Sequence, residues 1–337
     1  MGAQQPDDQR RDRIELAWFF VASFAVAWPL WLAGGVFEGA TPREILDARW
    51  MLAQLGVFAP SVAALLIGAL AGRRRECFVA LLAVFVPVTV VGFLVARRAV
   101  TNILSFAAGE KWLLVAVAAL VLLFFSPLNR TFRNPGRRAA MPPARLAWVA
   151  AAALAPFALF LPGWALANAG RPDVAVTLLG GGLVQGTAAF ALLWSFDLMF
   201  GGSLGEEIGW RGFALERLLA RMSPVRASAL LAVFWALWHA PIDVAFGFGL
   251  PGAGAVVVRL LWTLPLTMLF TWFFLRSGSS LLAPLALHTS LNVLPGLGFS
   301  GFEPAMAVLF VAVLVAGFAA AVALSRTNAA APPDGAA

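Results

Sequence analysis

The chain has 337 residues, of which 61% are hydrophobic and only 12% are charged, and its mean hydropathy is +0.86. A soluble domain carries about twice that share of charged residues, so this composition excludes a soluble globular protein. The net charge of +7 does not indicate a nucleic-acid partner, because the arginines form short clusters between apolar stretches instead of one continuous basic face.

Apolar stretches follow one another along the whole chain. A helix needs about 20 apolar residues to cross the hydrocarbon layer of a bilayer. The stretches that reach or approach this length are 14–35, 50–71, 77–96, 112–126, 146–167, 174–200, 227–248, 256–275, 279–298 and 303–325. Because 112–126 is short, we expect an all-α, polytopic transmembrane helical bundle with roughly 8–10 membrane helices.

The arginine clusters predict how the chain is oriented. They lie at 10–13, 73–75, 130–138, 217–226, 276 and 326. Under the positive-inside rule these clusters face the cytoplasm, which places both termini there and leaves Arg97 and Arg98 on the other side. The first apolar stretch is long and lacks a small-residue cleavage site, so we do not interpret it as a signal peptide. A chain rich in arginine and poor in lysine suggests a bacterium, and hence a bacterial cytoplasmic membrane.

The predicted spans fall into two groups. A polar tail at 1–13 precedes the N-terminal membrane helices at 14–126. A basic, proline-containing linker at 127–145 leads to further membrane helices at 146–326, and a disordered tail rich in Ala and Pro follows at 327–337. Polar residues at membrane depth become frequent only from about residue 197, so we expect any chemistry in the second group.

Two adjacent glutamates stand between apolar stretches of this second group. On a helix, Glu207 and Arg211 are one turn apart and can form an ion pair. Glu206 is rotated by about 100° from its neighbour and points elsewhere. One carboxylate would then be neutralised while the other is free to act. The alternative is a capping box, in which Ser203 and Glu206 only satisfy the start of a helix.

The chain has two histidines, His239 and His288, and both lie in apolar stretches. Ionisable groups inside hydrocarbon are costly unless paired or hydrated, so they indicate function by default. His239 follows Trp235 by four residues, so the indole would lie beside the imidazole and orient it, with Asp243 as a second partner. His288 and Asn292 are one turn apart and offer N–H donors to the same place. Taken singly, each of these residues is equally well explained as a hydrogen bond between helices.

Together these motifs resemble those of a known family, the CPBP intramembrane proteases, which include CAAX prenyl protease 2 and bacterial proteins linked to bacteriocin self-immunity. The matching residues are Glu206, Glu207, Arg211, Trp235, His239, His288 and Asn292. The resemblance covers roughly 175–300, including 209–213 and 279–284, and the family usually has Phe where this chain has Trp235. It implies a glutamate-dependent, metal-free peptidase with its site inside the helical bundle.

Hydrolysis of an amide bond needs a nucleophile, a base and donors to the oxyanion. No Ser–His–Asp set is apparent, and Cys77 is remote in sequence from both histidines, so water is the expected nucleophile. We predict Glu206 as the general base and His239 as the group that shares the water and passes its proton to the leaving amine. His288 and Asn292 would donate to the oxyanion. The supporting residues are Glu207, Arg211 and Trp235.

Three other hypotheses are compatible with the same residues. Glu206, His239 and His288 have the ligand types of a zinc site with an open position, although no H-E-x-x-H motif is present and we expect no cofactor. A non-enzymatic immunity or scaffold protein would use the polar cluster only to hold helices together. A proton-coupled transporter would need paired broken helices, which the sequence lacks. The expected partners are a membrane-associated peptide or protein substrate and the lipid bilayer.

Overall fold

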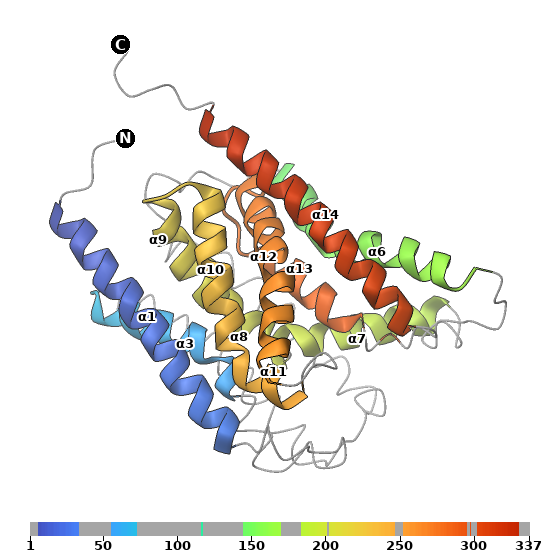
Figure 1. Cartoon of the computed structure of the whole chain (residues 1–337), viewed down its shortest axis with the longest axis horizontal. Coiled ribbons are helices and arrows are strands. Elements are labelled where there is room, and N and C mark those ends of the chain that lie inside the picture. Colours follow the sequence, from blue (N-terminus) through green and yellow to red (C-terminus); the bar gives the residue numbers. More distant parts are fainter. Residues whose placement is uncertain are drawn as a thin grey trace.

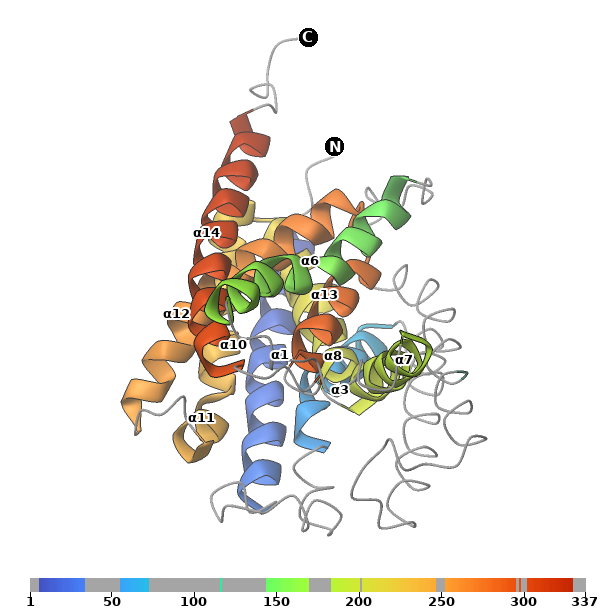
Figure 2. The same ribbon diagram turned by 90° about the vertical axis from the view of Figure 1, so that its right-hand side faces the viewer.

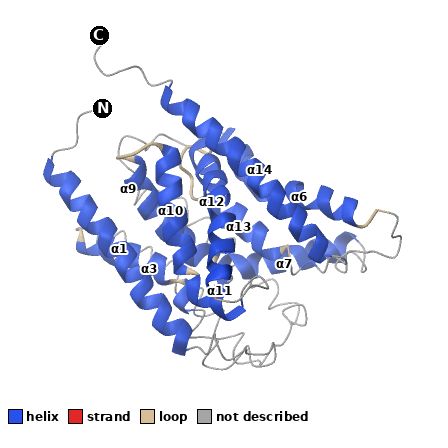
Figure 3. Cartoon of the chain, viewed as in Figure 1, coloured by secondary structure: helices blue, strands red, loops and turns tan. Residues whose placement is uncertain are grey.

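The structure is a computed structural model that describes residues 6–33, 55–72, 116, 144–169, 183–200, 202–246, 252–294, 297 and 302–329. Within these ranges the regular elements are helices, with no strand among them (Figure 3). The predicted all-α bundle is therefore confirmed. Several sequence features lie outside these ranges: Cys77, Arg97, Arg98, the arginine cluster 73–75, the stretches 77–96 and 112–126 apart from residue 116, linker residues 127–143 and tail residues 330–337.

Five helical segments of the described chain are long and apolar enough to cross a membrane. They are Arg10–Ala33, Leu146–Ala167, Thr187–Leu219, Ala253–Arg276 and Ala305–Arg326. These segments lie in α1 (Pro6–Ala33), in α6 (Ala144–Ala167), in the run that begins with α7 (Leu183–Phe200), in α12 (Ala253–Arg276) and in α14 (Phe302–Ala329). Helix also extends into both predicted tails, because α1 begins at Pro6 and α14 ends at Ala329. Proline is well suited to the first turn of a helix, since its missing N–H has no partner to lose there.

Three other predicted stretches hold shorter helices. α3 (Ala59–Leu70) and α13 (Leu282–Val293) have 12 residues each, and α10 (Pro224–Trp238) has 15 before α11 (Ala240–Phe246) begins. Twelve helical residues span about 18 Å, less than the roughly 30 Å of hydrocarbon. The polar groups at the ends of these helices must therefore find partners within the protein.

The short helices are enclosed by the long ones. α12 packs against both α10 and α14, and α6 packs against α13 and α14 (Figure 1). On the other side of the bundle α1 lies along α3, as Figure 2 also shows. α13 contacts α6, α7, α8 and α12, so His288 and Asn292 lie at a place where several helices meet.

The helix that carries the two glutamates contains a π-helical segment. α8 (Ser203–Glu207) continues into a π-helical turn, η5 (Ile208–Leu215), and ends with α9 (Glu216–Leu219). Gly202 lies between α7 and α8. Its φ is 110°, which only glycine adopts without strain. π-helical insertions are rare and are found mostly at functional sites.

The backbone of α3 packs closely against the backbone of the helix that carries the two glutamates. A Cβ atom at Gly209 would lie 2.5 Å from the carbonyl oxygen of Pro60, so only glycine fits at this contact. One turn away, the Ser61 hydroxyl donates to the carbonyl oxygen of Leu204 over 3.0 Å. α3 therefore fixes the position of the helix that carries Glu206 and Glu207.

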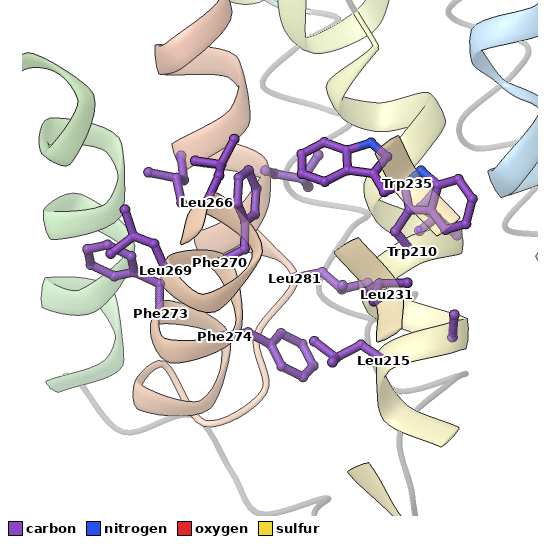
Figure 4. Packing of buried hydrophobic residues seen from close by; sticks show 14 of the residues in the cluster. Trp210, Leu215, Leu231, Trp235, Leu266, Leu269, Phe270, Phe273, Phe274 and Leu281 are labelled. Atoms are coloured by element: carbon purple, nitrogen blue, oxygen red, sulfur yellow. The ribbon is translucent and has the colours of Figure 1, made fainter. Parts of the chain in front are cut away.

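A core of large side chains fills the space between η5, α10 and α12 (Figure 4). Trp210 is fully buried, and its ring meets that of Trp238 edge to face at 5.7 Å. Phe270 of α12 is also fully buried and meets the Trp235 ring at 5.6 Å. These rings surround the polar groups described next and exclude water from most of their atoms.

Candidate active site

Glu207 is the centre of a buried charged cluster. Its Oε1 atom accepts a hydrogen bond from Arg211 Nη1 at 2.9 Å and a second from His288 Nδ1 at 2.8 Å. The Glu207 and Arg211 side chains have no exposed surface, so each compensates the charge of the other. The predicted pairing of Glu207 with Arg211 is present. The contact with His288, 81 residues further along the chain, was not predicted.

Aromatic rings on two helices complete the surroundings of Arg211. Its guanidinium carbon lies 4.1 Å from the ring centroid of Trp235 on α10 and 4.1 Å from that of Phe270 on α12. A cation between two ring faces is stabilised by their quadrupoles, by about 2 kcal/mol when the site is desolvated. The sequence predicted Trp235 as a neighbour of His239. The structure places the same ring against Arg211 as well.

Glu206 points away from this cluster and has its own partner. Its Oε2 atom accepts a hydrogen bond from Trp235 Nε1 at 2.6 Å, and the side chain is buried. The capping box was a wrong alternative. Gly202 is the N-cap of α8, no side chain caps this helix, and the Ser203 hydroxyl donates to Asp197 instead. The two adjacent carboxylates thus have separate partners, as the helical geometry predicted.

His239 caps the C-terminal end of α10. Its Nδ1 atom lies 2.9 Å from the carbonyl oxygen of Trp235, and because a carbonyl only accepts, Nδ1 carries the hydrogen. In the neutral ring Nε2 is then the acceptor. The ring meets Trp235 at 5.9 Å and Trp238 at 4.8 Å, which restricts its rotation. Predicting Asp243 as a second partner of this imidazole was wrong, because that carboxylate forms three hydrogen bonds of 2.6 to 3.0 Å with Arg259.

Asn292 has a partner that the sequence analysis missed. Its amide hydrogen-bonds the carboxylate of Asp197 on α7, and the Ser203 hydroxyl donates to the same carboxylate over 3.2 Å. His288 and Asn292 therefore lie on one turn of α13 but bind different acidic residues. A lone acidic residue in the apolar stretch 174–200 was the signal available for Asp197, since such residues indicate function by default.

A metal site with an open position needs at least three ligand side chains at one place. Among the residues that the structure describes, no three His, Cys, Asp or Glu side chains converge as a metal site requires. Glu207 is bound to Arg211 and His288, and Glu206 to an indole N–H. Both glutamates are thus held by hydrogen-bond donors.

The part of the chain that carries this cluster matches a known protein family. Residues 187–294 match the model of the Rce1-like type II CAAX prenyl endopeptidases. This segment belongs to the CPBP family. In an alignment of 100 positions that covers 26% of this chain, it is 30% identical to CAAX prenyl protease 2 of Methanococcus maripaludis. The match spans about a third of that relative, 34% of its length.

The CPBP segment contains the whole cluster. All of the site residues predicted from the sequence lie between 187 and 294, and so does Asp197. The long helices α1, α6 and α14 lie outside the match. They contribute the enclosing layer, not the polar groups of the cluster.

Proposed function

We propose that this protein is an intramembrane endopeptidase, which hydrolyses a peptide bond of a membrane-associated peptide or protein with a water molecule activated by Glu206. The observation that carries the proposal is that the two glutamates have different partners. Glu207 is neutralised by Arg211, whereas Glu206 accepts from a neutral donor, the indole of Trp235. The match to the CPBP family over this segment supports the same reaction class.

In the proposed reaction Glu206 takes a proton from water as the new bond from the water oxygen to the substrate carbonyl carbon forms. His239 shares this water through Nε2, because its Nδ1 atom is bound to the Trp235 carbonyl oxygen. The tetrahedral intermediate then collapses with cleavage of its C–N bond, and the proton passes to the leaving amine. The products are a carboxylate and an amine, as amide hydrolysis requires.

His288 and Asn292 are proposed to bind the oxyanion of the intermediate. Glu207 accepts from His288 Nδ1, so the other ring nitrogen, Nε2, can donate to the substrate when the ring is protonated. Arg211 balances the charge of Glu207 and keeps this imidazole in place. Donors preorganised in this way typically contribute about 2.7–4 kcal/mol each to stabilising the transition state.

The proposed substrate is a peptide or protein held at the membrane. The name of the archaeal relative makes a prenylated C-terminal peptide the first one to test. We further propose that the site requires no metal, and that both termini and the opening of the site face the cytoplasm. Arg217 and Arg221, which follow the glutamates on the chain, support this orientation.

The test is cleavage by the purified protein in proteoliposomes. Two quenched fluorescent peptides with the same CAAX-type C-terminal sequence are used, one farnesylated on cysteine and one not. We expect the wild-type protein to cleave at least one of them and Glu206→Gln to cleave neither. Equal cleavage by Glu206→Gln would remove the proposed base, and cleavage of the farnesylated peptide alone would establish the prenylated class.

A further inference from the structure

α1 lies outside the segment that matches the CPBP family, yet it packs against both of the helices that supply the proposed base and its histidine partner. The Phe19 ring of α1 stacks on the Phe213 ring of η5 at 5.1 Å. The next residue, Phe20, stacks on Phe234 of α10 at 3.9 Å. α1 therefore connects the helix that carries the two glutamates to the helix that leads to His239.

Two reciprocal hydrogen bonds connect α1 to Trp238, the last residue of α10. The indole Nε1 of Trp28 donates to the carbonyl oxygen of Trp238 over 3.0 Å. In the opposite direction, Trp238 Nε1 donates to the carbonyl oxygen of Ser23 over 3.2 Å. The last four carbonyl groups of an α-helix have no partner within that helix, and Trp28 donates to one of these four from another helix.

The carbonyl group that Trp28 binds belongs to the same peptide unit as the backbone N–H of His239. A peptide unit is planar, so a contact that fixes its oxygen also fixes the nitrogen and the Cα atom that follow. The N–H of His239 donates to the carbonyl oxygen of Ala236 over 3.1 Å, so this peptide unit is held at both ends. Because His239 is the C-cap of α10, the regular helix ends before it and α1 supplies part of the restraint.

The side chain of His239 depends on this backbone position. Its Nδ1 atom lies 2.9 Å from the carbonyl oxygen of Trp235, and its ring meets that of Trp238 at 4.8 Å. Trp238 is fully buried and in turn meets Trp31 of α1 at 4.6 Å. We propose that Trp28 is a positioning residue: through the Trp238 carbonyl it holds the His239 imidazole in the orientation that leaves Nε2 for the water of the proposed reaction. The inference rests on the proposed function.

Steady-state kinetics in the peptide cleavage assay tests this role. Trp28→Phe keeps an aromatic ring and removes the N–H, so we expect kcat to fall by about 5- to 10-fold with KM nearly unchanged. In the His239→Ala background the same change should lower kcat less than about twofold, because the residue that Trp28 positions is gone. Equal losses in both backgrounds would overturn the proposal. If His239→Ala cleaves no peptide, the spectroscopic test decides alone.

The spectroscopic test observes the orientation of His239 without substrate. The chain has only two histidines, so nitrogen NMR of the protein with isotope-labelled histidine shows two sets of ring signals, which His239→Gln assigns. At alkaline pH we expect the wild-type His239 ring to carry its hydrogen on Nδ1, because that atom faces a carbonyl oxygen. Trp28→Phe should give a mixture of both tautomers. Unchanged His239 signals in Trp28→Phe would overturn the proposal, whether or not the protein cleaves a peptide.

Two control variants on α1 separate positioning from general packing. Trp18 is exposed and lines a groove between α1 and α3, so Trp18→Phe should leave kcat and the His239 signals unchanged. Glu15→Gln weakens the 2.6 Å ion pair of α1 with Arg217 on α9, so it should lower the melting temperature and still leave the His239 signals unchanged.

Each outcome of these controls bears on a different claim. If either control moved the His239 signals as much as Trp28→Phe does, α1 would be a packing layer only and the proposal would fail. If the wild-type protein cleaves no peptide while Trp28→Phe moves the His239 signals, the proposed function fails and the positioning of His239 by α1 stands.

Discussion

Trp235 Nε1 donates a hydrogen bond of 2.6 Å to Glu206 Oε2, while the face of the same indole lies 4.1 Å from the Arg211 guanidinium. One side chain therefore contacts both the carboxylate proposed to act and the cation that neutralises its neighbour. Because Glu206 lies on α8 and Trp235 on α10, this contact also sets how the two helices meet.

Replacing Trp235 with Phe keeps a ring facing Arg211 but removes the N–H that binds Glu206. Hydrogen bonds to charged groups contribute about 1.5–3 kcal/mol, so we expect kcat/KM to fall about 10- to 100-fold. The melting temperature should change less than in Trp235→Leu, which also loses the cation–π contact. Steady-state kinetics and thermal unfolding measure the two effects. Unchanged kinetics in Trp235→Phe would show that the indole N–H does not orient the base.

Glu206→Gln should abolish peptide cleavage and leave the fold intact. The amide cannot act as a general base, yet its oxygen can still accept from Trp235 Nε1, so the helix contact is kept. Cleavage and melting temperature are measured on the same preparation. Cleavage near the wild-type rate would exclude Glu206 as the base.

Glu207→Gln should behave differently from its neighbour. It leaves the fully buried Arg211 without its counter-charge, and breaking a buried pair in this way costs about 3–5 kcal/mol. We expect a clear fall in melting temperature, together with reduced but detectable cleavage, because His288 also loses a charged partner. If instead Glu207→Gln were stable and inactive while Glu206→Gln were unstable and active, the two roles would have to be exchanged.

Activity should not depend on a bound metal. Protein washed with a chelator is expected to contain less than about one zinc per chain and to keep its cleavage rate, since water is activated by a carboxylate in the proposed reaction. Elemental analysis and the peptide assay on the same sample measure this. Stoichiometric zinc whose removal stops cleavage would favour the zinc-dependent alternative, with Glu206, His239 and His288 as candidate ligands.

The orientation of the bundle can be tested by cysteine labelling in a Cys77→Ala background. Ser203 is unsuitable as a reporter because it is fully buried, but Ala220 is exposed just after α9 and lies beside Arg221. Ala220→Cys should react with a membrane-impermeant thiol reagent from the cytoplasmic side only. Ala253→Cys, at the opposite end of α12 from Arg276, should react only from the other side. The reverse pattern would invert the predicted topology.

The sequence alone correctly predicted those features that depend on local helical geometry. Apolar stretches predicted the long helices, and the spacing of Glu207 and Arg211 predicted their ion pair, because residues four apart on a helix share a face. The same geometry separated Glu206 from Glu207. The sequence did not predict where the shorter helices end. α10 ends at Trp238 and α13 at Val293, well before the ends of their apolar stretches.

Only the tertiary structure decided which side chains on different helices become partners. Trp235 with Glu206, His288 with Glu207 and Asp197 with Asn292 are pairs that no spacing rule connects, and Asp243 binds Arg259 instead of the expected His239. Helical periodicity fixes the direction of a side chain on its own helix. Which helix lies opposite depends on many weak packing contacts across the bundle, such as the backbone approach at Gly209, and these are not encoded in any single motif.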